Sequence, residues 1–301
     1  MNVREPDWAY VARSLLRVLI VSMALFVALY AAEGALATFV DLDDKRLAQV
    51  YGTAARITNP DKRLSTGYSD GGGLLGTTYT LTGEPRRADH DQPWREYEIT
   101  KDLFGVIRAP SLSGPSGRLG DAITAVDANP GEDKTLTEAS RKAIDALPQT
   151  LEAVAVVEFT HAMTTEQLVA FNRKHRLCGG KDVSYVYAPS SYDDSDPIPL
   201  TNAIVWNRGM TAESDPTYQC ETEPEAALAE FRRWTRTLHE TDDLSQFGLT
   251  PNQLTETAKE GTVHALLLDR WKLSALSKLL DNPQTRTITL TDAAFNLGTP
   301  E

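Results

Sequence analysis

The sequence contains few cysteines and no excess of positive charge. Only two cysteines, Cys178 and Cys220, occur in 301 residues, and 30 Lys and Arg stand against 42 Asp and Glu, for a formal net charge of −12. Nucleic-acid backbones are bound by clustered Lys and Arg, so this balance argues against a nucleic-acid partner. Neither cysteine has a second cysteine or a histidine at ligand spacing, which argues against a metal site built on them.

The chain also lacks the motifs that usually accompany catalysis. Its five histidines are not within metal-ligand spacing of one another, and the nucleophile motif Gly-x-Ser-x-Gly is absent. The glycine-rich tract at residues 67–76 lacks the Lys-Ser/Thr ending of a phosphate-binding loop, so we interpret it as a bend. We therefore predict a protein that is not an enzyme, with no catalytic, cofactor-binding or metal-binding residues and no cofactor.

Two features are weak alternatives to this prediction. His161 follows a predicted strand, a place where catalytic groups occur, but no nucleophile motif accompanies it. The acidic segment at residues 192–197 (YDDSDP) has three aspartates that could bind Ca²⁺. It lacks the glycine and the closing glutamate of the helix-loop-helix calcium site, so a solvated loop is favoured. His264 alternates within an apolar strand, which is typical of a structural histidine.

The first forty residues carry the longest apolar run. Residues 18–32 contain one polar residue, Ser22, and the run can be extended across residues 11–40 to the length of about 20 residues that a membrane helix needs. A buried core helix is the weaker alternative, because the run has no amphipathic period. We predict a short cytoplasmic tail at residues 1–12 and a transmembrane helix or signal anchor at residues 13–40, with membrane lipid as a partner.

Charge around this run favours an orientation. Arg4, Arg13 and Arg17 precede it, whereas only Lys45 and Arg46 follow it closely, and Lys and Arg are enriched on the cytoplasmic side. We expect a single-pass protein of the cell membrane, with a cytoplasmic N-terminus and the bulk of the chain outside the cytoplasm. A cleaved signal peptide is the alternative, since residues 35–37 (ALA) fit a cleavage site. Both interpretations place the remainder outside.

An oxidising compartment favours pairing of the two cysteines. We predict a disulfide between Cys178 and Cys220, worth about 4 kcal/mol if it constrains the unfolded chain. Two unpaired thiols are the alternative.

The outer region divides into two predicted parts. Residues 41–135 form a membrane-proximal β-rich part, in which residues 42–56 continue the membrane helix or form a stalk. Its strand candidates, which alternate polar with apolar residues, are 77–82, 94–100 and 103–109. Residues 136–301 form an extracytoplasmic α/β domain, which begins with a helix at 136–146, with Thr135 or Thr137 near its start.

From residue 150 the pattern predicts the order β-α-β-β-α-α-β-α-β. The strands are expected at 151–159, 183–187, 203–206, 263–268 and 286–290, and the helices after Thr164 and at 224–238, 250–260 and 273–280. Thr164 and Gln167 form a capping-box signature, and Thr250 with Pro251 marks another helix start. Helices between strands imply an α/β (α+β) fold, a split β-α-β mixed sheet with helices packed on it.

Several strings, in order, resemble the sigma factor regulator family of membrane-anchored anti-sigma factors of Gram-positive bacteria. They are YGTAARITNP (51–60), GGGLLGTTYTL (71–81), the segment 139–172 and the segment 261–297. The resemblance implies an outer domain that senses a signal, whose chemistry it leaves open, and a protein partner, a sigma factor or a membrane regulator. The dozen residues before the apolar run are too few for the family's sigma-binding domain. We therefore expect a sensory or regulatory role in sigma-factor signalling without that domain.

The alternative is an exported binding or protease-inhibitor-like module. The closing segment 264–290 also resembles the propeptide-like inhibitors of subtilisin-type proteases. A cleaved N-terminus would favour this alternative, and an intact one favours the membrane-anchored regulator. An exported hydrolase would need an activity that no motif predicts.

Overall fold

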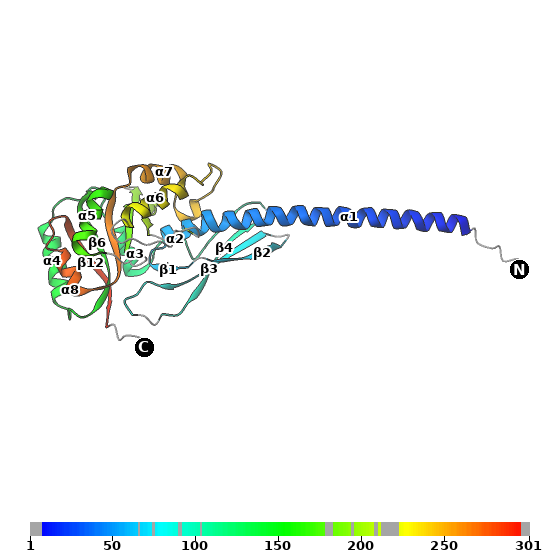
Figure 1. Ribbon diagram of the computed structural model, residues 1–301. Coiled ribbons are helices and arrows are strands. Elements are labelled where there is room, and N and C mark those ends of the chain that lie inside the picture. Colours follow the sequence, from blue (N-terminus) through cyan, green and yellow to red (C-terminus); the bar gives the residue numbers. More distant parts are fainter. Residues whose placement is uncertain are drawn as a thin grey trace.

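The computed structural model describes residues 8–65, 67–73, 76–89, 92–102, 104–177, 183–193, 196–207, 210–211 and 223–295. The chain forms a mixed α/β head from which one long helix projects (Figure 1).

The projecting helix runs directly into the head. Helix α1 (Trp8–Arg46) is followed without a break by the π-helix η1 (Leu47–Gly52) and helix α2 (Thr53–Thr58). The expected continuation of the first helix through residues 42–56 is thus confirmed. Within the described part of the chain, no helix combines the length and the apolar character needed to cross a membrane. The side chains of residues 29–43, which complete the predicted span, lie outside the described residues.

An antiparallel sheet, here called the N-terminal sheet, lies along α1. Its strands are β1 (Lys62–Leu64), β2 (Tyr68–Gly73), β3 (Gly76–Pro85), β4 (Arg95–Asp102) and β5 (Ile107–Arg108). β3 pairs with β1, β2 and β4, and β5 adds to β4. The strands expected at 77–82 and 94–100 are confirmed as β3 and β4.

Two expectations for this sheet were wrong. The glycine-rich tract at 67–76 contains the strand β2, because pairing with β3 uses backbone groups and needs no particular side chain. The strand expected at 103–109 is reduced to the two residues of β5. Asp102 accepts hydrogen bonds from the backbone N–H groups of Phe104 and Val106, and this turn replaces the start of the strand.

The central sheet has the strand order β10-β7-β11-β6-β12, and every neighbouring pair is antiparallel. Its strands are β6 (Glu152–Met163), β7 (Val183–Ala188), β10 (Ile204–Trp206), β11 (Val263–Lys272) and β12 (Thr285–Ala294). β6 and β7 flank β11, and β11 and β12 flank β6. This is a double split β-α-β arrangement of ferredoxin-like topology. The split β-α-β core is confirmed, whereas the sheet is antiparallel rather than mixed.

The helices of the head connect these strands. They are α3 (Gly117–Thr124), α4 (Lys134–Asp145), α5 (Thr165–His175), α6 (Glu223–Thr235), α7 (Pro251–Glu260) and α8 (Leu273–Leu279), with a 3-10 turn at Ser245–Phe247. The capping box of Thr164 and Gln167 is present, and Thr250 caps α7. Thr135 and Thr137 lie near the start of α4 as expected, and Asp133, two positions before Thr135, is the N-cap.

Both faces of the central sheet are buried. Alternate residues of β6, such as Ala155 and Val157, face the larger apolar cluster, which includes α5, α6, η1, α2 and side chains of the N-terminal sheet. The intervening Val154 and Val156 face a smaller cluster with Ile123 of α3. The base of the projecting helix is therefore part of the main core.

A small hairpin lies at the predicted acidic loop. Strands β8 (Ser191–Asp193) and β9 (Asp196–Thr201) pair with each other. The side chains of residues 192–200 lie outside the described residues, so a calcium site there stays a weak alternative.

Candidate functional site

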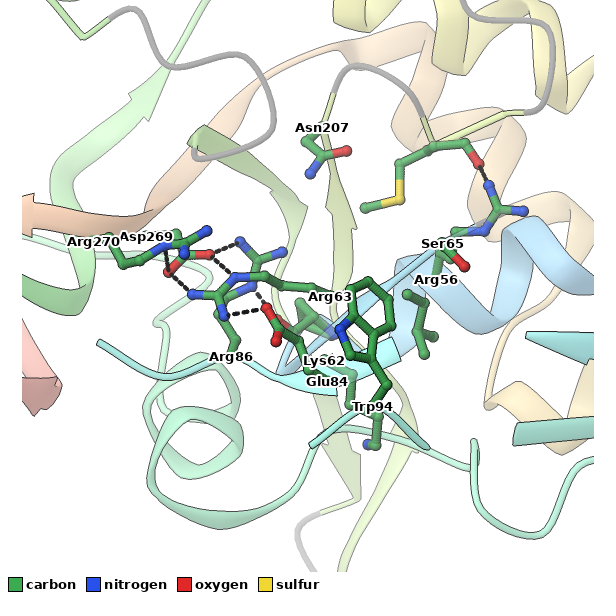
Figure 2. Close-up of a pocket in the computed structure, with 13 residues that line it drawn as sticks. Arg56, Lys62, Arg63, Ser65, Glu84, Arg86, Trp94, Asn207, Asp269 and Arg270 are labelled. Atoms are coloured by element: carbon green, nitrogen blue, oxygen red, sulfur yellow. Dashed lines mark hydrogen bonds and ion pairs between the residues drawn. The ribbon is translucent and has the colours of Figure 1, made fainter. Parts of the chain in front are cut away.

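A cavity of about 330 Å³ lies where α2, β1 and β3 meet the end of β11 (Figure 2). Its described lining contains five cationic side chains and two carboxylates. These are Arg56, Lys62, Arg63, Arg86 and Arg270, with Glu84 and Asp269. The lining therefore has an excess of positive charge in a chain that is acidic as a whole.

The buried carboxylate of Asp269 organises one side of this cavity. Asp269 is 1% exposed and accepts hydrogen bonds from Arg63 Nε at 2.7 Å and Nη2 at 2.6 Å, and from Arg86 Nη1 at 2.9 Å (Figure 2). Arg63 also donates from Nη1 to Glu84 Oε1 at 3.0 Å. Two guanidinium groups thus share one buried carboxylate. Arg63 binds it through two nitrogens, in the bidentate geometry that is specific to arginine, and Arg86 binds it through one.

Burial and charge act in opposite directions on Arg63. Burial lowers the pKa of its guanidinium, but the hydrogen bonds to Asp269 and the charges of Asp269 and Glu84 outweigh burial and raise that pKa. Arg63 is a fixed cation whose net role is to hold the two carboxylates in place.

Local backbone features place these groups together. β1 begins after the Asn59-Pro60 turn, which brings Arg63 beside β3. Arg270 has a left-handed backbone with φ of 56°, and the pairing of β11 shifts register between Leu268 and Trp271. This irregularity lies directly at Asp269, as is common where a strand re-aims a side chain.

Arg56 lines the opposite side of the cavity (Figure 2). It is 4% exposed and donates from Nη1 to the backbone oxygen of Met210. Burial lowers the pKa of Arg56, which Tyr79 and Glu230 partly oppose. Among the described residues, its Nε and Nη2 atoms have no hydrogen-bond partner.

The described lining of the cavity offers cationic, hydroxyl and aromatic groups to a ligand. Its described lining contains no histidine or cysteine. Ser65 supplies the hydroxyl group of this lining, and its Oγ lies 2.7 Å from Thr82 Oγ1 and 2.9 Å from Thr82 O. Trp94, which is 65% exposed, adds an aromatic surface at the edge. A small anion is the ligand class that this charge and shape favour.

A second hollow continues the cationic surface. Its volume is about 680 Å³, and it shares Lys62 and Arg86 with the first cavity. Three further arginines line it, Arg87, Arg95 and Arg118, against two carboxylates, Asp61 and Asp292. Basic side chains therefore gather around β1 and the β3–β4 connection.

The residues singled out from the sequence lie elsewhere. Cys178 and Cys220 are outside the described residues, so their disulfide stays a prediction. His161 is exposed near the end of β6, and among the described residues no hydrogen bond joins its ring to a hydroxyl or thiol group. Among the described residues, no group of three or more His, Cys, Asp or Glu is placed to hold a metal ion. The arginines of the cavity were missed, because they are spread from residue 56 to residue 270 with no local motif.

Comparison of the chain with protein-family models, with curated proteins and with solved structures found no match. The resemblance to the sigma factor regulator family therefore stays a prediction that rests on the quoted strings.

Proposed function

We propose that this protein is a membrane-anchored regulatory protein whose head, outside the cytoplasm, binds an anionic ligand or partner group. The observation that carries the proposal is one continuous segment, residues 8–64. It begins as the projecting apolar helix, enters the core of the head, and ends on the wall of the arginine-lined cavity.

The surface of α1 supports an anchor. Ten large apolar side chains between residues 15 and 27 are each at least 58% exposed. They are Leu15, Leu16, Val18, Leu19, Ile20, Val21, Met23, Leu25, Phe26 and Val27. A run of this size is costly in water and is a typical membrane or partner surface. Arg13 and Arg17, at its N-terminal side, favour a cytoplasmic N-terminus.

The base of α1 is fixed to the head, which supports a role in transmitting signals. Arg46 pairs with Asp242, and Trp234 donates from Nε1 to the backbone oxygen of Gln49 at 2.7 Å. Arg56, on the same continuous segment, lines the cavity. Binding in the cavity would therefore act on a segment that is directly joined to the anchor.

The resemblance supports sigma-factor signalling as the pathway, with a sigma factor or a second membrane regulator as the partner. An exported binding or protease-inhibitor-like module is the second candidate, and the split arrangement of β11, α8 and β12 is the observation that favours it.

Two measurements on the full chain test this proposal. Alkaline extraction of membranes should leave the chain in the pellet with an intact N-terminus. The variant Val21→Arg/Leu25→Arg should move to the supernatant, whereas Glu96→Arg/Glu98→Arg, two exposed positions of β4, should not. A parent chain found entirely in the supernatant, or beginning near residue 38, would favour the exported module.

The regulatory part needs a separate readout. Deletion of the gene should change transcription from envelope-stress promoters, and gentle cross-linking should recover a sigma factor or a membrane regulator with the chain. Unchanged transcription from all such promoters would contradict the sigma-factor role while leaving the anchor intact.

A further inference from the structure

Phe104 lies in the turn between β4 and β5, where hydrogen bonds link the described residues. Asp102 Oδ1 accepts hydrogen bonds from Phe104 N at 2.9 Å and from Val106 N at 3.0 Å. The backbone adds Gly105 N to Asp102 O at 2.9 Å and Asp102 N to Val106 O at 3.1 Å. Despite these four bonds, Phe104 is 91% exposed and Val106 is 49% exposed.

This turn lies at one end of the N-terminal sheet. Gly76, the first residue of β3, pairs with Asp102, the last residue of β4, and with Gly73, the last residue of β2, so these strand ends lie beside the start of the β4–β5 turn. We call the described residues at this end of the sheet, namely 73, 76, 102 and 104–106, the sheet tip. In Figure 1 the strands of this sheet extend along α1, and the tip points toward the N-terminal end of that helix.

Packing fixes the level of the sheet tip along the helix. A Cβ atom on Gly52 would lie 2.6 Å from Tyr79 Cε1, so the ring of Tyr79 packs against the end of η1. From Tyr79, β3 continues toward the tip for three residues, which span about 10 Å. The same distance covers about seven residues of helix, which places the tip beside the C-terminal part of α1. The apolar run of the sequence ends in that part of the helix, at Val40, just before Asp41.

We propose that the sheet tip inserts Phe104 into the interfacial layer of the same bilayer that α1 enters. This inference rests on the proposed membrane anchor. An isolated exposed apolar residue is ordinary on a protein surface. Here a hydrogen-bonded turn places it at the end of a sheet that extends along α1, close to the level where that helix would leave the membrane. Aromatic side chains favour this layer.

Charge next to the tip fits a headgroup region. Lys101 and Arg108 lie at the base of the turn, where Lys101 pairs across to Ile107 in the strand register. Cationic side chains at this depth attract anionic headgroups. Two attachment points, the helix and the tip, would hold the head in one orientation on the membrane.

Site-directed spin labelling of the full chain in lipid vesicles tests the inference. Labels are placed through Phe104→Cys, through Phe295→Cys and through Phe26→Cys. Phe295 is a matched control, because it is 61% exposed and directly follows β12, which lies in the part of the head away from the free end of the N-terminal sheet (Figure 1). The parent chain, treated in the same way, reports any labelling of Cys178 and Cys220.

Oxygen partitions into the bilayer, whereas a water-soluble nickel chelate stays in water. We therefore expect the label at position 104 to be more accessible to oxygen than to the chelate. The label at position 295 should be more accessible to the chelate than to oxygen. A label at 104 as accessible to the chelate as the label at 295 would overturn the inference. So would dipolar broadening between labels at 104 in detergent, which would indicate that the tip contacts a second copy of the chain. The label at position 26 tests the anchor separately, since a water-exposed label there would contradict the proposed function itself.

Discussion

Arg63 Nε and Nη2 bind the two carboxylate oxygens of Asp269, although the residues are 206 positions apart in the chain. The pair joins β1, which directly follows the helical segment, to the irregular end of β11. Because Asp269 is 1% exposed and also binds Arg86, the three side chains act as one buried ionic unit.

Removing the carboxylate should therefore be costly. Asp269→Asn removes the carboxylate that the mostly buried guanidinium groups of Arg63 and Arg86 share, and leaves Glu84 as the carboxylate partner of Arg63. We expect a loss of about 3–5 kcal/mol in the free energy of unfolding. Denaturant titration of the parent and variant measures it. Asp281→Asn is the control, because Asp281 forms an exposed pair with Arg141 and should cost less than about 1 kcal/mol. Equal losses in the two variants would contradict a dominant role for the buried unit.

The close contact of Gly52 with Tyr79 predicts overpacking. Gly52→Ala places a methyl group 2.6 Å from Tyr79 Cε1, and we expect a loss of about 1–3 kcal/mol of stability. Tyr79→Leu should relieve the clash, so the double variant should lose less than the sum of the single variants. Gly131→Ala is the control, because a methyl group there meets nothing within 4 Å. A harmless Gly52→Ala would show that the helix and the sheet are not packed this closely.

The capping box of α5 predicts a smaller loss. Thr164→Ala removes the oxygen that accepts from the backbone N–H of Gln167, and we expect a loss of about 1 kcal/mol. Thr255→Ala, inside α7, removes a hydroxyl that bonds only back to Pro251 O at 2.8 Å, and it should be neutral or slightly stabilising. Thermal unfolding compares the two, and the same change in both would contradict the cap.

Burial of His264 predicts a dependence of stability on pH. Burial lowers its pKa below the ordinary value of 6.5, an effect that Glu260 and Asp127 partly oppose. The unfolded chain then binds more protons than the folded chain between the lowered pKa and 6.5. The contribution of His264 to the free energy of unfolding should be fully present above this window of pH, and it should decrease as the pH falls through the window.

Unfolding titrations at about pH 8 and about pH 5 check this expectation. His264→Gln should reduce the loss of stability on acidification, whereas His239→Gln, at an exposed position, should leave it unchanged. Burial also lowers the pKa of His175, so part of the dependence should persist in the His264 variant. Identical pH profiles for the parent and the His264 variant would contradict the assignment.

The predictions that succeeded concern neighbours in sequence. Thr164 and Gln167 are three residues apart, so a capping box can be recognised from their types and spacing. The Val-rich run that becomes β6 predicts a buried strand for the same local reason. Thr135 and Thr137 lie at the start of α4 as expected, whereas the N-cap Asp133, whose carboxylate accepts from the backbone N–H groups of Thr135 and Leu136, was not predicted.

The predictions that failed depend on pairing at a distance. The antiparallel order of the central sheet places β11 between β6 and β7, and no local pattern encodes that neighbour. β2 forms on glycines because the edge of β3 supplies its hydrogen bonds. The cavity could not be foreseen, since Arg63 and Asp269 meet only when both sheets are in place.

The entry of the helix into the core also limits how the head could be released from a membrane. Leu47 and Val50 are 1% exposed and Ile57 is fully buried, so the last turns of the helical segment are an interior element of the head. A protease that sheds the head in folded form must cut before Arg46. A cut within residues 47–58 would remove part of the core. It would therefore unfold the head and would not release it in folded form.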